Sequence, residues 1–430
     1  MTKLNWIKNL PTPIAIIGLG KSGRSALALL KAIGLKETDL LTFDQKDPSA
    51  QLSNPEDLVA KNPRTLVVSP GVPLSLDWVQ SLIHWGAVLT SEISLATAFL
   101  TTEKIIGVTG SVGKSTVVSL LGAAARTKDI HFFIGGNLGT PFCDYALRVV
   151  NNEPVATWIV LELSSYQLEN CSYLELDFSA ITFLSANHLE RYPDLMSYYE
   201  TKFKITATTK KTCVINSTSV DAVKYSSLAK CHVELINSSS SLSKDERTKI
   251  TLLGSHNHDN FAVAKKLAQL AGWNTSAIQE MTFFQGLPHR LEDIGTFKGV
   301  RFINDSKATA LDSVCVAVES CLEKVTAPHS LYLLLGGKDK NLPWFDLAFL
   351  KQEARIKFVF FGSCGGLAKD LSGLSGLVLD TLNAAIDHCL DSAQAHDIVL
   401  LSPGGTSLDE FKNFEDRGNF YTTKITGYFK

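Results

Sequence analysis

Short apolar runs alternate with longer amphipathic stretches along most of the chain. Four of these runs predict strands, namely Ile14–Ile17, Leu40–Phe43, Thr65–Val68 and Lys104–Val108. Stretches with helical spacing follow the first and last of them, over residues 25–33 and 117–125. Strands separated by helix-length segments are typical of right-handed βαβ units and parallel sheets. The pattern therefore predicts an α/β fold.

Two glycine-rich loops, near residues 18 and 110, each follow a predicted strand, so each would open its own sheet. A turn at residues 286–288 precedes a further apolar run over residues 300–303. We therefore predict three domains, comprising residues 1–102, 103–288 and 289–430. In the middle domain, the polar segment 237–245 predicts an exposed loop, and residues 261–271 predict an amphipathic helix.

Composition excludes several classes of protein. The 430 residues are 45% hydrophobic and 20% charged, which is typical of globular proteins. There are 41 basic and 43 acidic residues, so the basic excess of a nucleic-acid-binding protein is absent. No apolar run reaches the roughly 18 residues of a membrane span, and the N-terminus does not resemble a signal peptide. We expect a cytoplasmic protein whose eight cysteines, none in a CxxC pair, are reduced and mostly buried.

The first chemical motif is the glycine loop Gly18-Leu-Gly20-Lys21-Ser22-Gly23, directly after a predicted strand. Such a loop lets a phosphate approach backbone amides at a helix N-terminus. Asp44 follows the next strand, where an acid can accept a hydrogen bond from a ribose hydroxyl. The motif indicates a nucleotide site without specifying NAD or another nucleotide, and a tight turn without a ligand is the alternative.

The second motif, Thr109-Gly-Ser-Val-Gly-Lys-Ser-Thr116, is a phosphate-binding P-loop between a predicted strand and a predicted helix. Its amides would surround phosphate oxygens, Lys114 would reach the β and γ phosphates, and the Ser115 hydroxyl would bind Mg²⁺. Val108 stands where the strict pattern has glycine, but the Gly113-Lys114-Ser115 sequence is intact. We predict ATP or GTP binding here.

Three more segments of the middle domain carry polar groups. Glu162 follows the apolar run over residues 158–161, where a second magnesium ligand is expected, although a solvated loop acid is the alternative. His188 could ligate a metal or donate a hydrogen bond to an oxyanion, although a single loop histidine more often does neither. For Lys202 a solvated helix face is the alternative. Asn257 and Asn260 could bind an adenine edge or a phosphate, or could cap a helix. The neighbouring His256 and His258 have a spacing seen in metal sites, but no third ligand nearby supports a zinc site.

The C-terminal third contains four polar clusters, at residues 286–290, 304–309, 336–340 and 402–407. Ligands of open parallel sheets gather at the carboxyl ends of the strands, so these clusters could form one site from several loops. Lys307 and Lys340 favour an anionic second substrate. Ordinary polar loops are the alternative for each cluster taken alone.

Taken together and in order, these motifs resemble the Mur ligase family. The resemblance rests on the P-loop and on the segments 162–168, 188–192, 286–292, 303–309 and 400–418, and it runs from about residue 14 to about residue 425. There are three rival interpretations. One is another ATP-dependent amide ligase, such as a folylpolyglutamate synthase or a different Mur ligase. The others are a dinucleotide-dependent oxidoreductase and a P-loop switch protein. The N-terminal glycine loop argues against the other ligases. An oxidoreductase would leave the P-loop unexplained, and a P-loop switch protein would leave the C-terminal clusters unexplained.

The resemblance implies a Rossmann-like N-terminal domain, a P-loop central ATPase domain, and a Rossmann-like C-terminal domain that closes over the site. It also implies a monomer that uses ATP to add D-glutamate to UDP-N-acetylmuramoyl-L-alanine through an acyl phosphate. That reaction belongs to peptidoglycan precursor synthesis, and so to cell wall biogenesis, cell shape and cell division.

Residue roles are implied by the same resemblance. The UDP-linked precursor would contact Gly18, Lys21, Ser22, Asp44, Ser69, Gly71, Asn137 and Gln167. ATP would contact Gly110, Ser111, Gly113, Lys114, Ser115, Thr116, Asn257, Asn260, Arg290 and Asp305. D-Glutamate would contact Lys307, Thr309, Lys340, Ser407, Leu408 and Phe414. Two Mg²⁺ ions would be held by Ser115, Glu162, His188 and Lys202, with Lys114, His188 and Lys202 as the catalytic group.

Lys202 matches a lysine that the family carries as a carbamate formed from CO2. A carbamate can bind Mg²⁺ whereas an ammonium cannot, and its formation needs a neutral amine, so we predict a depressed pKa for Lys202. The chain departs from the family pattern at Val112, Asn187, Ala310 and residues 404–406. These departures affect the expected metal affinity and substrate stringency, and leave the reaction class unchanged.

Overall fold

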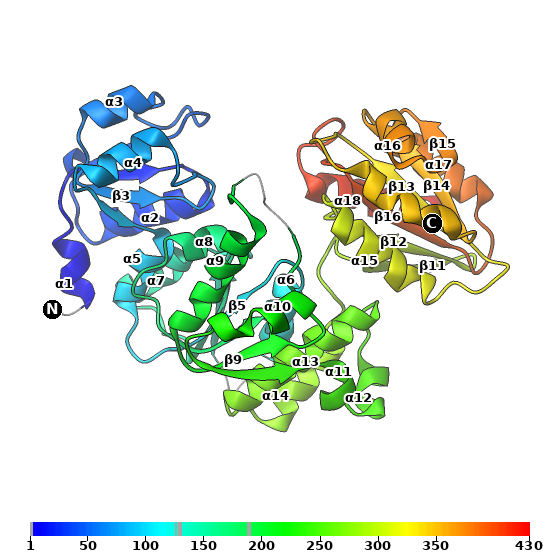
Figure 1. Ribbon diagram of the computed structural model, residues 1–430, viewed down its shortest axis with the longest axis horizontal. Coiled ribbons are helices and arrows are strands. Elements are labelled where there is room, and N and C mark those ends of the chain that lie inside the picture. The colour runs from blue at the N-terminus through cyan, green and yellow to red at the C-terminus, as the bar shows by residue number, and fades with distance from the viewer. Residues whose placement is uncertain (1–2, 125–126, 128–130, 187–190) are drawn as a thin grey trace. The chain divides into compact units, whose positions relative to one another are not determined.

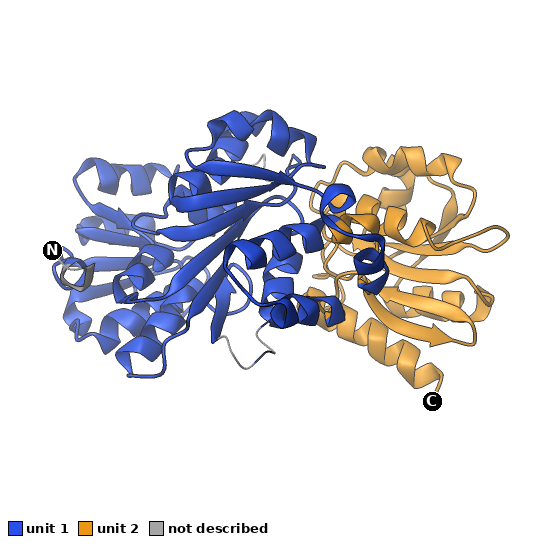
Figure 2. Cartoon of the chain, turned by 90° about the horizontal axis from the view of Figure 1, so that it is seen from below, with its two compact units in different colours: residues 1–249, 259–283 blue, residues 250–258, 284–430 orange. Residues whose placement is uncertain are grey.

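The computed structural model describes residues 3–124, 127, 131–186 and 191–430. These residues form two compact units (Figure 2), of which unit 1 comprises residues 1–249 and 259–283 and unit 2 comprises residues 250–258 and 284–430. Unit 1 contains two sheets and unit 2 contains one (Figure 1). The predicted α/β class, with parallel sheets covered by helices, is confirmed.

The N-terminal sheet has the strand order β2-β1-β3-β4 and is entirely parallel. Its strands are β1 (Ile14–Ile17), β2 (Leu40–Phe43), β3 (Thr65–Val68) and β4 (Val88–Thr90). All four residues of β1 are buried, as expected for a strand covered by helices on both faces. The accompanying helices are α1 (Lys3–Lys8), α2 (Lys21–Ala32), α3 (Pro55–Ala60), α4 (Asp77–His84) and α5 (Glu92–Ala96). The three predicted strands of this sheet are confirmed.

The central sheet, also in unit 1, has the order β10-β9-β8-β5-β7-β6 and is parallel throughout. Its strands are β5 (Lys104–Thr109), β6 (Phe132–Gly136), β7 (Trp158–Glu162), β8 (Leu176–Ile181), β9 (Thr209–Asn216) and β10 (His232–Ile236). Its main helices are α6 (Lys114–Ala123), α7 (Phe142–Val150), α8 (Ser165–Glu169), α9 (Leu195–Ala207), α10 (Val220–Lys224), α13 (Ser255–Leu270) and α14 (Thr275–Glu280). The P-loop strand β5 lies in the interior of this sheet, between β8 and β7.

The sheet of unit 2 has the order β11-β12-β16-β13-β14-β15. Its strands are β11 (Glu292–Phe297), β12 (Val300–Asn304), β13 (Leu331–Gly336), β14 (Ile356–Phe361), β15 (Gly376–Leu379) and β16 (Ile398–Gly404). Its α-helices are α15 (Leu311–Leu322), α16 (Gly365–Ser372), α17 (Leu382–Ser392) and α18 (Phe414–Tyr428). Five strands are parallel, whereas β11 pairs antiparallel with β12, which the expectation of parallel sheets did not include.

Two local predictions in the middle of the chain are wrong. The segment 237–245 was expected to be a loop but contains the helix α11 (Ser238–Ser241) and the start of α12 (Lys244–Lys249). The helix expected over residues 261–271 begins at Ser255, so Asn257 and Asn260 lie inside it and do not cap its start. Both errors arise because polar residues form these first turns, so the apolar period does not reveal them.

All eight cysteines are free thiols; five are buried and three are half-buried, which confirms the predicted state. Across the described ranges of the chain, no helix combines the length and the apolar character that crossing a membrane would require.

Candidate active site

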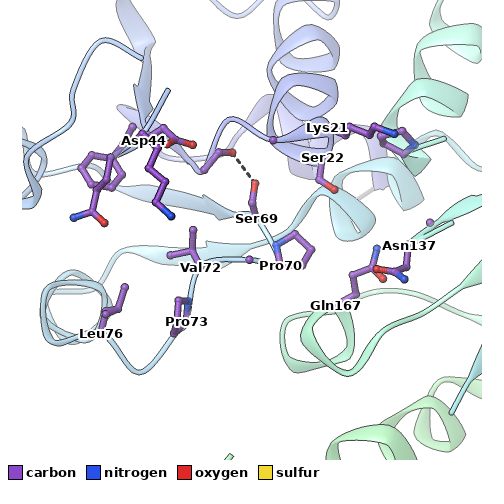
Figure 3. A pocket seen from close by; sticks show the side chains of 18 of the residues that line it. Lys21, Ser22, Asp44, Ser69, Pro70, Val72, Pro73, Leu76, Asn137 and Gln167 are labelled. Carbon is purple, nitrogen blue, oxygen red and sulfur yellow. Dashed lines mark hydrogen bonds between the residues drawn. The ribbon is translucent and has the colours of Figure 1, made fainter. Parts of the chain in front are cut away.

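A cavity of about 540 Å³ lies in unit 1 at the carboxyl ends of the N-terminal strands (Figure 3). Loops after β1, β2 and β3 form one wall, and residues after β6 and in α8 form the other. All eight residues expected to contact the precursor line it: Gly18, Lys21, Ser22, Asp44, Ser69, Gly71, Asn137 and Gln167. The structure thus brings together residues separated by up to 149 positions in the sequence.

The glycine loop after β1 is held in place by its neighbours. Gly18 has a φ of +88°, which disfavours any residue with a side chain, and a Cβ added there would lie 2.9 Å from the Cβ of Ser69. The Ser69 hydroxyl donates a 2.7 Å hydrogen bond to the Gly18 carbonyl oxygen. The loop leads directly into α2, whose N-terminus therefore faces the cavity with its first-turn amides.

Asp44 fixes the same loop from the next strand. Its carboxylate accepts hydrogen bonds from the backbone N–H groups of Leu19 at 2.8 Å, Lys46 at 2.8 Å and Asp47 at 3.0 Å. These bonds, that from Leu19 first, hold the pKa of Asp44 below its usual value, so the side chain is an anion. Asp44 therefore organises the loop at the cavity rim.

Asn137 and Gln167 lie on the wall contributed by the central sheet (Figure 3). The Asn137 side-chain amide donates a 2.6 Å hydrogen bond to Oε1 of Glu162, and its backbone N–H donates to the Glu162 carbonyl oxygen at 2.9 Å. Gln167 completes a capping box with Ser164 at the start of α8. The cavity wall is therefore linked directly to the acid at the end of β7.

The P-loop joins β5 to α6 and is tied to the segment after β8. The Ser111 and Val112 N–H groups donate to the Phe183 carbonyl oxygen at 2.7 and 3.3 Å, so these two amides have a protein acceptor. The Ser111 hydroxyl donates to the Ser185 carbonyl oxygen at 2.9 Å and lies 3.0 Å from the Tyr198 hydroxyl. Helix α6 begins directly after Gly113, which has a left-handed backbone conformation with a φ of +89°, and a helix N-terminus of this kind favours anions.

Two lysines converge on this loop. Lys114 Nζ donates to the carbonyl oxygens of Gly110 at 2.8 Å and Ser111 at 3.0 Å, and Lys202 Nζ donates to that of Gly110 at 2.8 Å. Lys202 is 2% exposed and also lies over the Tyr198 ring, 4.7 Å from its centroid. Burial, reinforced by the charge of Lys114 and opposed by that of Glu162, lowers the Lys202 pKa well below its ordinary value. The predicted depressed pKa is confirmed.

The donors expected for Mg²⁺ fit such an ion. Glu162 is 2% exposed, and its Oε2 atom is buried without a hydrogen-bond partner among the described residues. A buried carboxylate oxygen without a partner is costly unless a cation or a donor satisfies it. Ser115 is also buried, at the first turn of α6. His188, expected to hold a second ion, lies outside the described residues.

The two asparagines expected near ATP lie on α13. A Cβ added to Gly113 would come within 2.4 Å of Oδ1 of Asn260, so the Asn260 side chain lies directly against the P-loop in unit 1. Asn257 belongs to unit 2, where its side-chain amide donates to the Leu253 carbonyl oxygen at 2.6 Å. Both side chains are buried.

Asp305 is a buried acid at the end of β12 in unit 2. It accepts hydrogen bonds from the Leu291 N–H at 3.1 Å and the Ser402 hydroxyl at 2.9 Å. Burial raises its pKa to about 7 against the opposing effects of these bonds and of the charges of Arg290 and Arg417. Arg290 and Asp305, which were both expected to contact ATP, therefore lie close enough for their charges to interact.

The expected D-glutamate contacts gather around the loops of unit 2. Lys307 Nζ lies over the Phe414 ring, 4.0 Å from its centroid, and the loops carrying Lys340 and Ser407 pair through Lys338 and Thr406, whose N–H groups each donate to the other's carbonyl oxygen. Lys340 and Leu408 are exposed, Thr309 is half-buried and Ser407 is buried. The structure thus provides cations, a hydroxyl and an aromatic ring within one domain.

Comparison with known proteins decides the family. The sequence profile of the Mur ligase middle domain matches residues 108–269. The UDP-N-acetylmuramoylalanine–D-glutamate ligases of Myxococcus xanthus and Haemophilus influenzae are each 32% identical to this chain over 95% of its length, covering 96% and 97% of their own lengths. The chain belongs to the Mur ligase family.

Solved structures support the fold of this Mur ligase. MurF ligase from Thermotoga maritima, in complex with ADP, aligns over 98% of this chain and 97% of its own with a TM-score of 0.62 at 13% identity. The UDP-N-acetylmuramate–alanine ligase MurC from the same organism aligns over 97% and 100% with a TM-score of 0.60 at 14% identity. At these identities the likeness bears on the three-domain fold alone.

Sequence reasoning missed the residue that joins the loops of unit 2 in this Mur ligase. Arg417, fully buried in α18, donates to the Ser306 hydroxyl at 3.0 Å, the Ser306 carbonyl oxygen at 2.8 Å and the Gly405 carbonyl oxygen at 3.1 Å. Burial lowers the pKa of Arg417 to about 10, although the negative charges of nearby acids oppose this shift. The only sequence signal was its place in the 400–418 segment, which does not show what it contacts.

Proposed function

We propose that this Mur ligase uses ATP to join D-glutamate to UDP-N-acetylmuramoyl-L-alanine, forming an amide bond in peptidoglycan precursor synthesis. The observation that carries the proposal is the 32% identity, along 95% of the chain, to enzymes named for that reaction. The cavity in unit 1 and the cationic loops of unit 2 supply the chemistry that these substrates need.

The UDP-linked precursor would occupy the cavity of about 540 Å³. The glycine loop and the N-terminus of α2 suit the diphosphate, because first-turn amides and the helix dipole favour anions. Asn137 and Gln167 would hold the part of the precursor that faces the central sheet. Since Asn137 is bonded to Glu162, correct seating of the precursor would be transmitted to the phosphate end of the site.

ATP would bind at the P-loop, with Asn257, Asn260, Arg290 and Asp305 as further contacts. A carboxylate is a poor electrophile, because its charge repels the amine and oxide is a poor leaving group. The alanyl carboxylate oxygen would therefore attack the γ phosphorus with loss of ADP, giving an acyl phosphate. The D-glutamate amine would then attack that carbonyl carbon, and phosphate would leave. Lys114 would balance the charge that develops on the transferred group.

Mg²⁺ would be held by Ser115, Glu162, His188 and Lys202, and we propose two ions. When bound, these ions neutralise phosphate charge and orient the transferred group. The depressed pKa of Lys202 favours the neutral amine, which is the form that reacts with CO2, so the residue would act as a carbamate. That group would supply the anionic oxygen that an ammonium lacks.

D-Glutamate would bind in unit 2, with Lys307 and Lys340 facing its carboxylates and Thr309, Ser407, Leu408 and Phe414 completing the pocket. The stack of Lys307 on Phe414 would keep the ammonium in place. We further propose a cytoplasmic monomer with domains at residues 1–102, 103–288 and 289–430.

The test is phosphate release from Mg-ATP with UDP-N-acetylmuramoyl-L-alanine, with D-glutamate present, absent, or replaced by L-glutamate and other amino acids. We expect release only when the precursor and D-glutamate are both present. Release with another amino acid or another precursor would preserve the ligase chemistry and overturn the proposed substrates. NAD reduction, or slow GTP hydrolysis alone, would overturn the reaction class.

A further inference from the structure

Arg191 is a buried guanidinium that no step of the proposed reaction uses. Its side chain is 9% exposed and makes a two-point ion pair with Glu169, with Nε 3.0 Å from Oε1 and Nη2 2.6 Å from Oε2. The guanidinium also lies over the Tyr166 ring, with its central carbon 4.1 Å from the ring centroid. The side chain of Arg191 is therefore anchored to α8, the helix that also carries Gln167.

The outer edge of the same guanidinium reaches the loop after β3. Nη1 donates to the Pro70 carbonyl oxygen at 2.8 Å, and Nη2 donates to the Val72 carbonyl oxygen at 3.3 Å. These two carbonyls flank Gly71, and Figure 3 shows Pro70 and Val72 beside Ser69 at the cavity wall. One side chain of the central sheet thus holds the loop contributed by the N-terminal sheet.

The contacts fix which way the loop's peptide groups face. Arg191 does not line the large cavity; it lines a separate pocket of about 10 Å³, of which Ser69, Pro70 and Val72 form a shared wall. In a trans peptide the N–H and C=O groups point in opposite directions. Because the Pro70 carbonyl faces Arg191, the Gly71 N–H points away from Arg191, and Gly71 itself lines the large cavity.

We propose that Arg191 is a positioning residue for the UDP-linked precursor. By holding the carbonyls of the 70–72 loop on one side, it presents the Gly71 amide to an anionic group of the precursor on the other. Arginine suits this task because its planar fork makes several directed bonds at once, which a lysine cannot reproduce. The inference rests on the proposed function only for the identity of the precursor.

The test compares Arg191→Lys with Arg355→Lys. Arg355 is a matched control in unit 2, where its guanidinium makes a two-point pair with Glu353 at 2.8 and 2.7 Å and donates to the Val325 carbonyl oxygen at 2.9 Å. For R191K we expect the KM for the precursor to rise about tenfold, with kcat and the KM for ATP changing by less than about threefold. For R355K we expect no change in any of these constants.

A fall in kcat of R191K with an unchanged precursor KM would overturn the proposal, since it would place the effect on the chemistry and not on seating. Glu169→Gln provides a second variant if R191K folds poorly, because it leaves the guanidinium and both loop carbonyls in place. Its precursor KM should rise less than that of R191K, and a larger rise would contradict the role given to the loop contacts.

Calorimetric titration with UDP alone separates this inference from the proposed function. Weaker UDP binding by R191K than by the wild type supports the inference whichever amino acid the enzyme uses. Equal UDP affinity together with an unchanged precursor KM would reject the inference. Loss of D-glutamate-dependent turnover in the wild type would instead reject the proposed function.

Discussion

Lys114 and Lys202 donate to the same acceptor, the carbonyl oxygen of Gly110, although 88 residues separate them in the chain. Two ammonium groups so close together repel each other, and Lys202 is the more deeply buried. The repulsion and the desolvation act in the same direction, and both lower the pKa of Lys202. Under the proposed function, this pair would place Lys114 on the phosphate and leave Lys202 to react with CO2.

We expect activity to require the Lys202 side chain and CO2. Lys202→Ala should lose activity by about 10- to 100-fold, as is typical when a group that supports a metal is removed. Lys204→Ala, on the exposed side of the same helix, is the control and should retain full activity. Removal of CO2 should lower wild-type activity and added bicarbonate should restore it, measured by phosphate release. A fully active K202A, or a wild type that never responds to bicarbonate, would contradict the carbamate.

A second prediction concerns the glycine loop. Gly18→Ala should raise the KM for the precursor by at least about tenfold, because the new methyl group meets Ser69 in a left-handed backbone conformation. Gly34→Ala is the control. Gly34 has a similar φ of +92°, so the variant carries the same backbone strain, but nothing lies within 4 Å of an added Cβ, so the new methyl group meets no neighbour. Both variants should lose some thermal stability, but only G18A should bind UDP weakly. Equal UDP affinities would show that the loop does not contact the nucleotide.

A third prediction concerns the pH dependence of stability. Glu92, buried in α5, accepts a hydrogen bond from the Cys143 N–H at the start of α7, and desolvation raises its pKa to about 7 from 4.5. Between these two values the unfolded chain releases the proton while the folded protein keeps it. The free energy of unfolding therefore falls as pH rises from 4.5 to about 7, by roughly 3 kcal/mol, and is then constant with respect to this group.

Glu92→Gln removes this titration while keeping an acceptor for the Cys143 N–H. The stability of E92Q relative to the wild type should therefore increase across the interval from pH 4.5 to 7, as measured by urea unfolding at several pH values. Glu200→Gln, at an exposed position, is the control. Parallel pH profiles for E92Q and the wild type would exclude Glu92 as the source.

A fourth prediction concerns the loops of unit 2. Arg417→Lys retains the charge but cannot make all three hydrogen bonds to Ser306 and Gly405. We expect the KM for D-glutamate to rise by about tenfold or more, because Lys307 follows Ser306 and Ser407 lies two residues after Gly405. Arg301→Lys, at the partly exposed pair with Asp293, should leave that KM unchanged. If both variants behave alike, Arg417 does not organise the pocket.

The strands of the N-terminal sheet could be predicted because their signal is local. Each is a largely apolar run, with Thr42 and Thr65 as the polar members, as a strand buried on both faces requires. The observed bounds of β1, β2 and β3 match the predicted ones. The antiparallel strand β11 was missed because its turn, Lys298-Gly299, is not a recognisable hairpin sequence, although both residues adopt positive φ. The serine-rich helix α11 is capped by Asn237, whose side-chain oxygen accepts a hydrogen bond from the Ser240 N–H. A hydropathy pattern does not reveal such a cap.

The candidate site likewise has features that the sequence predicts and features that it does not. Residue types at the P-loop and at the ends of strands could be read from their spacing, because a loop between a strand and a helix has few alternatives. What joins them could not be read, since the bonds from Lys202 to Gly110 and from Arg417 to Ser306 span 92 and 111 residues. Such contacts depend on how separate elements pack, and no local pattern encodes them.

The position of β16 has a consequence for how the protein is made. It is the last strand of the chain, yet it lies between β12 and β13 in the middle of its sheet. During synthesis those two strands have no shared neighbour until residues 398–404 have left the ribosome. The C-terminal sheet therefore completes its core only when translation is nearly finished, and a chain released early, even a few tens of residues short, would expose two unpaired strand edges to aggregation.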